Sequence, residues 1–317
     1  MKPENRAIIK TLAFYDALGH TPLTALELYR RLLRPEVGAA VPVSFGSFFK
    51  KLSDIKSEYI SASRGFYFLK ENVGGYRKRV QIGKTGIAKW RIARRMIRLI
   101  SFLPFVRMVG ITGSLALHMT NKESDIDVLI VTKHGHIWAA RIFVSFFMQI
   151  FGYRRHGSCV RDRICLNHYV SDSSLILRPQ TLFSAHICAT FLPVWSKYGV
   201  SERFLNQNNK RVASYFYHER YSPTDFRSVK EDIPLFFLAI RCFFEFVVFR
   251  ISGRFLEFLC RKVQAQRIRR NMESMGVAPG AVIFDDEALV FHHPRPASQE
   301  AMVLYEQHLG RLGFKQN

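Results

Sequence analysis

The chain has 317 residues, of which 48% are hydrophobic and 23% are charged, which is typical of a folded protein with a sizeable core. These proportions exclude a mostly disordered chain, a collagen-like repeat and a disulfide-stapled miniprotein. Lysine and arginine number 47 against 25 aspartates and glutamates, so the formal net charge is +22. This excess favours polyanionic partners, either nucleic acid or an acidic membrane surface, and disfavours cationic substrates.

The five cysteines are scattered, and none of them forms a CxxC pair or lies at zinc-ligand spacing from histidines. We therefore expect reduced thiols. The first twenty residues lack the apolar run of a signal peptide. Both features predict a cytoplasmic location.

Residues 1–72 are predicted to form three helices followed by a β-hairpin. Thr24 and Glu27 have the spacing of a capping box, and Ser44 is a candidate cap for the third helix. Apolar residues then alternate on both sides of Arg64-Gly65, which predicts the hairpin turn. This order is typical of a winged helix, a module that binds nucleic acid or serves in docking.

Residues 73–105 are predicted to form a basic linker helix. Four arginines recur at three- and four-residue spacing and would share one helix face: Arg91, Arg94, Arg95 and Arg98. Such a stripe is either a solvated face or a track for nucleic-acid phosphates.

Residues 106–180 alternate between apolar strands and an apolar helix, which predicts an α/β core with a mixed sheet. Residues 181–317 are predicted to be a helical region that ends in a hairpin, turning at Asp285–Glu287, and a closing amphipathic helix.

The segment 233–251 is very apolar and rich in phenylalanine, but it also contains Arg241, Glu245 and Arg250. Arg241 and Glu245 are four residues apart and can pair on a helix. The segment is either a buried amphipathic helix or a peripheral membrane contact. In the second case the following cations would meet the membrane: Arg261, Lys262, Arg267, Arg269 and Arg270.

The strongest motif joins Gly113-Ser114, ten intervening residues and Asp125-Ile126-Asp127. Residues two apart on a strand project to the same face, so the two aspartates would lie side by side. Paired carboxylates suit Mg²⁺ (or Mn²⁺), while a Gly-Ser turn at a helix start offers amides and a hydroxyl to phosphates. Two such ions would assist an in-line phosphoryl displacement.

This segment, V-x-I-T-G-S-L-A-L followed by S-D-I-D-V-L-I-V-T, resembles the signature of the DNA polymerase beta-like nucleotidyltransferases. The resemblance implies a minimal palm-like core that transfers a nucleoside monophosphate from an NTP with Mg²⁺ and releases pyrophosphate. It assigns Gly113 and Ser114 to nucleotide binding, and Asp125 and Asp127 to metal binding and catalysis. The wider chain resembles bacterial proteins that carry this domain behind a winged-helix-like start.

The family usually has a third carboxylate on a later strand, and here that strand reads RICLNHYVS. Asn167 is the candidate for the third catalytic position, although an amide cannot take a proton. His168 is either a base in its place or a structural hydrogen-bonding residue. Arg154 and Arg155 precede this strand and are expected to contact nucleic acid.

Together these features predict transfer of a nucleoside monophosphate to a nucleic-acid end. Two alternatives remain open: nucleotidylation of a protein or small acceptor by the same core, and a non-catalytic winged-helix protein that binds nucleic acid through a decayed transferase fold.

Overall fold

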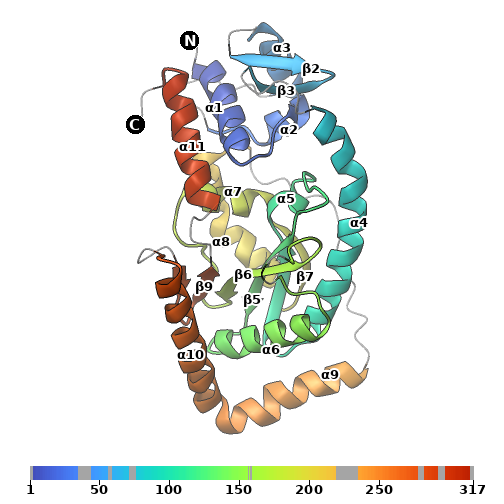
Figure 1. The fold of residues 1–317 in the computed structure, drawn as a ribbon, viewed down its shortest axis with the longest axis vertical. Helices are drawn as coiled ribbons and strands as arrows, with labels where there is room; N and C mark the ends of the chain where they lie inside the picture. The colour runs from blue at the N-terminus through green and yellow to red at the C-terminus, as the bar shows by residue number, and fades with distance from the viewer. Residues whose placement is uncertain are drawn as a thin grey trace.

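The computed structural model describes residues 3–34, 44–55, 59–70, 76–155, 157, 159–218, 235–277, 282–291 and 297–314. Within them the chain is a mixed α/β protein, with a six-stranded mixed sheet, a small three-stranded sheet and helices around both (Figure 1). The predicted α/β class and mixed sheet are confirmed.

The first elements form a helical unit closed by the small antiparallel sheet. They are α1 (Pro3–Ala17), β1 (Leu23–Thr24), α2 (Ala25–Arg30), α3 (Phe45–Asp54), β2 (Ile60–Ser63) and β3 (Phe66–Leu69), with strand order β1-β3-β2. The predicted capping box of Thr24 and Glu27 is present, and Ser44 caps α3. Arg64 and Gly65 both have positive φ, 51° and 82°, as a two-residue hairpin turn of this type requires. The local sequence signals of this region are therefore confirmed.

The basic helix and the large sheet follow. Their elements are α4 (Tyr76–Ser101), β4 (Val106–Ile111), α5 (Gly113–Ala116), β5 (Ile126–Thr132), α6 (Ile137–Ile150), β6 (Ile164–Ser171), α7 (Leu182–Thr190), β7 (Leu192–Ser196) and α8 (Val200–Tyr215). After them come α9 (Leu235–Cys242), a π-helical segment (Phe243–Val248), α10 (Phe249–Ser274), β8 (Val282–Phe284), β9 (Ala288–Phe291) and α11 (Ala297–Arg311). The helix predicted at 76–98, the terminal hairpin and the closing helix are confirmed.

The large sheet has the strand order β7-β4-β5-β6-β9-β8, and only the β5–β6 pair is parallel. It extends beyond residues 106–180, because β7 and the β8–β9 hairpin come from the region expected to be helical. Helices predominate among the described residues of 182–275, as expected, but β7, a five-residue strand that contains Pro193, was not predicted. Proline is tolerated there because β7 lies at the edge of the sheet.

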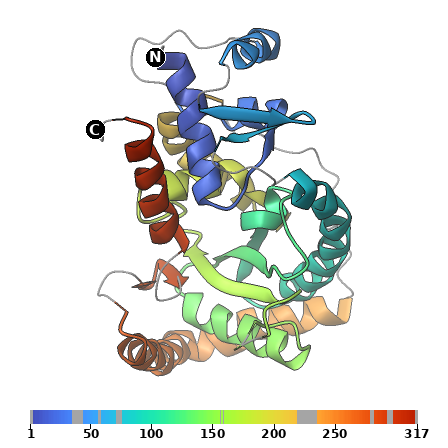
Figure 2. The same ribbon diagram turned by 45° about the horizontal axis from the view of Figure 1, so that its top comes forward.

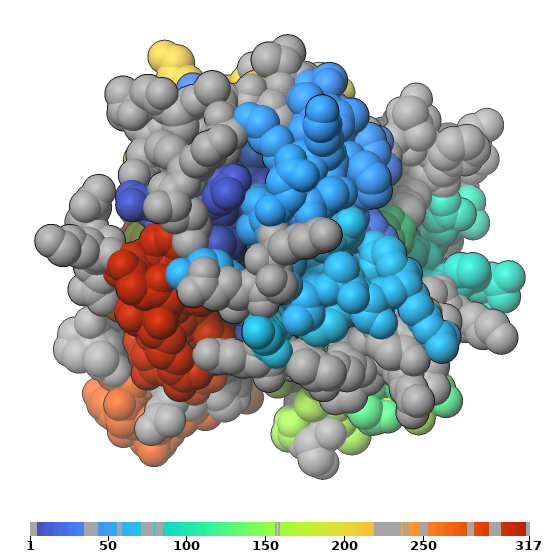
Figure 3. Space-filling view, turned by 90° about the horizontal axis from the view of Figure 1, so that it is seen from above, coloured from blue at the N-terminus to red at the C-terminus, as the bar shows by residue number. Residues whose placement is uncertain are grey.

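One hydrophobic core joins the N-terminal unit to the large sheet. It contains Leu12 and Phe14 of α1 and Phe48 of α3 together with Leu129 of β5 and Phe204 of α8. At the other end of the chain, α11 packs along α1 (Figure 1, Figure 2), and from above it lies directly beside the N-terminal elements (Figure 3). The described part of the first 70 residues is therefore packed against the rest of the chain.

Deleting residues 1–72 is expected to destabilise the rest of the chain, since apolar surface on α7, α8 and α11 would become exposed at about 25 cal/mol per Å². Thermal unfolding and light scattering of fragment 73–317 measure this. A monomeric fragment that unfolds cooperatively at the temperature of the full chain would contradict the expectation and support an independent module.

Charged side chains dock the described part of the apolar segment 233–251, which begins at residue 235, onto the sheet. Arg241 and Glu245 pair as predicted, with Nε and Oε1 3.2 Å apart. Glu245 also accepts hydrogen bonds from Arg107 and from the backbone N–H of Phe105, while Arg241 donates to the carbonyl of Val106 at 2.7 Å. Burial opposes ionisation of Glu245, but the hydrogen bond and charge of Arg107 hold its pKa below the usual value.

Among the described residues, no helix combines the length and apolarity needed to cross a membrane.

Candidate functional site

The Gly-Ser turn packs directly against the second aspartate of the motif. β4 ends at Ile111, and the backbone N–H of Thr112 donates to the carbonyl of Asp127 at 3.0 Å. Gly113 has a φ of +63°, and a Cβ at this position would collide with the Asp127 carboxylate. Glycine is therefore required here both for the backbone conformation and for the close approach. The helix that follows, α5, has only four residues, so the predicted helix start is a single turn.

Gly113→Ala is expected to lower the free energy of unfolding by about 1–3 kcal/mol and to displace the Asp127 carboxylate. Gly135→Ala is the matched control, because Gly135 has a φ of +71° but a methyl group added there would have no neighbouring atom within 4 Å. Urea unfolding of both variants measures the difference. Equal losses of stability and activity would show that the approach of Gly113 to Asp127 is unimportant.

The two aspartates of the motif lie together, as their spacing predicts. Asp125 immediately precedes β5 and Asp127 is its second residue. Ligand atoms of Asp125, Asp127 and Cys165 all lie within 4.8 Å of one another. Cys165 is the residue directly opposite Asp127 on the parallel strand β6. The motif pointed only to the aspartates, and Cys165 was missed because its position depends on the strand register.

Arg155, which was predicted to contact nucleic acid, forms an ion pair with Asp125. Its Nη1 lies 2.5 Å from Oδ2 of Asp125 and 3.8 Å from Sγ of Cys165. The guanidinium is 38% exposed, and the Asp125 carboxylate is 17% exposed. A positive charge therefore already compensates one of the two carboxylates.

The other carboxylate is poorly compensated. Burial, and then the negative charge of Asp125, raise the pKa of Asp127 to about 7, although Arg155 opposes this. Burial likewise raises the pKa of the Cys165 thiol, which stays protonated at neutral pH. Two carboxylates at this separation fit Mg²⁺ or Mn²⁺, which prefer oxygen ligands, whereas a neutral thiol does not add to such a site. The donor set thus fits a hard divalent cation held by Asp125 and Asp127.

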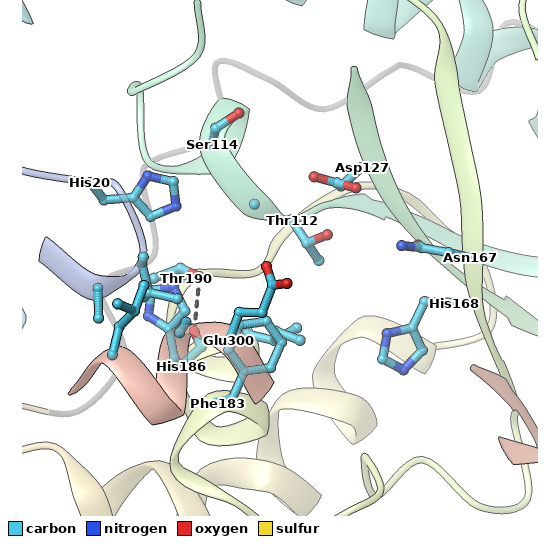
Figure 4. A pocket seen from close by; sticks show the side chains of 16 residues that line it. His20, Thr112, Ser114, Asp127, Asn167, His168, Phe183, His186, Thr190 and Glu300 are labelled. Atoms are coloured by element: carbon cyan, nitrogen blue, oxygen red, sulfur yellow. Dashed lines mark hydrogen bonds between the residues drawn. The ribbon is translucent and has the colours of Figure 1, made fainter. Parts of the chain in front are cut away.

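A cavity of about 390 Å³ opens beside Asp127 (Figure 4). It is lined by the end of α1, the turn Thr112–Ser114, Asp127 of β5, Asn167 and His168 of β6, and residues of α7 and α11. Asn167 therefore shares the cavity with Asp127, although Cys165 is the closer neighbour across the strands. Ser114 also lines this cavity, whereas Asp125 turns to Arg155.

A second carboxylate reaches the cavity from the closing helix. Glu300 lies in the first turn of α11, and its side chain points into the cavity towards Thr112, on the side where Asp127 lies (Figure 4). Ala301 and Tyr305 of the same helix are buried, which fixes α11 against α1. The sequence carried no signal for Glu300, since an acidic residue in a first helical turn is common.

Two imidazoles of the cavity, those of His20 and His186, are uncharged at neutral pH. Burial, followed by the charge of Arg31, lowers the pKa of His20 to about 4. Burial also holds the pKa of His186 well below its usual value, and its Nδ1 is hydrogen-bonded to the Tyr15 hydroxyl at 3.2 Å. The acidic groups that line the cavity are Asp127 and Glu300, so this space attracts cations or metal-bound phosphates.

A buried lysine holds the loop in front of Asp125. Lys89 of α4 is 1% exposed, and its ammonium donates to the carbonyls of Lys122 and Ser124 and pairs with Asp162 at 2.6 Å. The arginine spacing predicted a basic outer face for α4 but gave no sign of this inward-pointing lysine. Lys89 ties the loop before β5 to the loop before β6.

The predicted nucleic-acid contacts divide into two groups. The four arginines of the α4 stripe are all exposed, as predicted: Arg91, Arg94, Arg95 and Arg98. Arg154 is half-buried, and Arg155 is engaged by Asp125. Only the α4 stripe therefore keeps the geometry of a cationic surface.

Comparison with protein-family models, with curated proteins and with solved structures gives no match for this chain. What the protein does has to be inferred from the arrangement of the site itself.

Proposed function

We propose that this protein is a metal-dependent nucleotidyltransferase that transfers a nucleoside monophosphate from an NTP to the end of a nucleic acid and releases pyrophosphate. The observation that carries the proposal is the contact of the Gly113 turn with Asp127, with Asp125 beside it. This contact gives the Gly-Ser and Asp-x-Asp halves of the motif a physical reason to occur together. The parallel β5–β6 pair and the helix–strand order of the first 70 residues are consistent with a transferase core behind a winged-helix-like unit.

Asp125 and Asp127 would hold Mg²⁺ or Mn²⁺, and such an ion when bound neutralises phosphate charge and orients the triphosphate. The turn of Gly113 and Ser114 lies beside it and offers a hydroxyl to a phosphate. When the nucleotide binds, Arg155 would release Asp125 and contact phosphate oxygens instead, since a guanidinium binds phosphate oxygens in the same forked manner as carboxylate oxygens.

The acceptor hydroxyl oxygen attacks the α-phosphorus, and the bond from that phosphorus to the oxygen of the leaving pyrophosphate breaks. The proton lost by the hydroxyl needs an acceptor, which the amide of Asn167 cannot be. Glu300 is the carboxylate that projects into the same cavity, so we assign it the role of general base and Asn167 that of orienting the acceptor.

Two observations bear on the acceptor. The exposed arginines of α4 favour a nucleic acid, because cations at helical spacing can follow a phosphate backbone. The cavity of about 390 Å³, bounded by α1, α7 and α11, favours a small acceptor or the terminal residue of a chain. A nucleic-acid end satisfies both.

The test is incubation of the purified chain with α-labelled NTPs and Mg²⁺ or Mn²⁺, in the presence of RNA, DNA ends or neither. We expect label in a nucleic acid, and none with Asp125→Asn. Arg91→Gln/Arg95→Gln/Arg98→Gln should flatten the salt dependence of binding, since each phosphate contact contributes about −0.9 to the log–log slope on duplex DNA. Arg267→Gln/Arg269→Gln/Arg270→Gln on α10 is the control with the same charge change.

If label is transferred only to small molecules or to the protein itself, the acceptor is not a nucleic acid. The second candidate function, nucleotidylation of a protein or small acceptor, would then replace it. Nucleic-acid binding without any transfer would overturn the enzymatic proposal and favour a decayed transferase fold.

A further inference from the structure

The solvent-facing side of α10 carries large apolar side chains. Phe255, Phe258, Leu259 and Val263 recur at helical spacing and are 64%, 58%, 39% and 64% exposed. We call these four residues the α10 apolar face. The preceding segment also exposes Phe243, at 53%. Single exposed apolar residues are ordinary, but a continuous helical stripe of them marks an interaction surface.

The opposite side of α10 is firmly docked, so this exposure does not arise from a loosely attached helix. Glu257 accepts hydrogen bonds from the backbone N–H groups of Trp138 and Ala139, at 2.8 and 3.0 Å, and so caps the start of α6. Gln264 donates to the carbonyl of Trp138 and accepts from Arg141. Figure 1 shows α10 along the lower left side of the molecule, away from the N-terminal unit at the top.

Cations surround the α10 apolar face. The helix contains seven basic and two acidic residues, and Glu257, one of the acids, is turned inward to α6. The exposed cations of the helix include Arg254, Lys262, Arg267, Arg269 and Arg270. At 100° per residue, Lys262 lies between Phe258 and Leu259 in angle, and Arg270 continues the same side of the helix. Arg269 is also exposed, with its guanidinium 6.0 Å from the ring centroid of Phe284 in β8. The surface therefore combines apolar and positive groups on one face.

The presence of apolar and positive groups on one face indicates which class of partner fits this surface. A second copy would bring two strongly positive helices together, which Coulomb repulsion opposes. A nucleic acid would satisfy the cations but leave the phenylalanines in water. An anionic lipid surface satisfies both, because the apolar side chains enter the acyl region while the lysine and arginine heads stay among the lipid headgroups.

We propose that α10 is a membrane-surface anchor that lies in the plane of an anionic lipid bilayer, with Phe255, Phe258, Leu259 and Val263 in the acyl boundary and the neighbouring cations against anionic headgroups. The inference rests on the exposure and charge of α10 and not on the proposed transferase activity. It holds whether or not that activity is found.

Sedimentation of the full chain with vesicles tests the proposal. Phosphatidylcholine vesicles are compared with vesicles that also contain phosphatidylserine. We expect tight binding only to the second kind, weakened by salt because the charges are exposed. Phe255→Ser/Phe258→Ser should lower the partition coefficient about tenfold or more. Lys262→Gln/Arg269→Gln/Arg270→Gln should lower it by about fivefold per charge.

Two matched controls accompany these variants. Ile87→Ser/Val303→Ser removes two exposed apolar side chains, 61% and 53% exposed, from α4 and α11, and should leave vesicle binding unchanged. Arg91→Gln/Arg95→Gln/Arg98→Gln removes three exposed charges from α4 and should have a smaller effect than the α10 charge variant.

Hydrogen exchange of the wild-type chain with and without vesicles provides a second readout that needs no variant, and protection should be gained over 243–270. Equal vesicle binding by the α10 variants and their controls would overturn the proposal. So would a wild-type dimer that binds no vesicles and that Phe255→Ser/Phe258→Ser converts to a monomer, since a second copy would then cover this face. RNA binding that is lost with the α10 charges, without any vesicle binding, would overturn it in favour of nucleic acid.

Discussion

Asp127→Asn is expected to abolish nucleotidyl transfer, by at least about 10³-fold, and at the same time to make the protein more stable above neutral pH. The loss of activity follows because one of the two oxygen ligands of the proposed metal site disappears. The gain in stability follows because the Asp127 carboxylate is half-buried beside Asp125, and of these two carboxylates only Asp125 has a cation directly on it.

The pH dependence has a definite sign. Burial and the neighbouring Asp125 raise the pKa of Asp127 from 3.8 to about 7. The folded protein thus keeps this proton up to about pH 7, while the unfolded chain loses it near pH 4. Stability present at low pH is therefore lost as the pH rises through this window. Asparagine has no charge to lose, so the variant should unfold with a free energy about 1–3 kcal/mol above the wild type at pH 8 and equal to it near pH 4.

Asp125→Asn is the matched control, because it removes a carboxylate that Arg155 already neutralises. It should abolish transfer equally but give little gain in stability at pH 8. Urea unfolding at both pH values measures the difference, and Mg²⁺ should raise the Tm of the wild type but of neither variant. Full transfer activity in Asp127→Asn would falsify the metal role, and equal stability changes in the two variants would contradict the assigned charge distribution.

Glu300→Gln is expected to lower the rate of the transfer step about 10²- to 10⁴-fold, the usual contribution of a general base. The fold should be unaffected, since Glu300 is exposed and the neighbouring Ala301 and Tyr305 supply the packing of α11 on α1. Nucleotide binding should persist, because the metal pair and the Gly-Ser turn remain. The loss should therefore appear in kcat, while the KM for the NTP changes little.

Glu306→Gln is the control, an exposed glutamate on the same helix that does not line the cavity. It should leave kcat and KM unchanged. If Glu300→Gln retains the wild-type kcat, the proton goes elsewhere, and His168 becomes the next candidate to replace because it lines the same cavity.

Much of the local structure could be predicted because its causes lie within a few residues of one another. The Thr24–Glu27 capping box, the cap of α3 and the Arg64–Gly65 turn each depend on side chains or dihedrals of adjacent positions. The approach of Gly113 to Asp127 spans a longer stretch of chain, and the antiparallel pairing of the consecutive strands β4 and β5 brings the two residues together. The sequence by itself therefore determined the α/β class, the N-terminal elements and the pairing of the turn with the aspartates.

Only the tertiary structure decided which other groups join the site. Cys165 faces Asp127 because of the parallel register of β6, and Arg155 reaches Asp125 from the loop before that strand. Glu300 enters the cavity because α11 packs on α1, at the opposite end of the chain. Hydrophobic periodicity tells which face of an element is buried but not which element covers it. The same reason hid β7, a short edge strand, and hid the apolar face of α10, because its exposure depends on which side of the helix packs against α6.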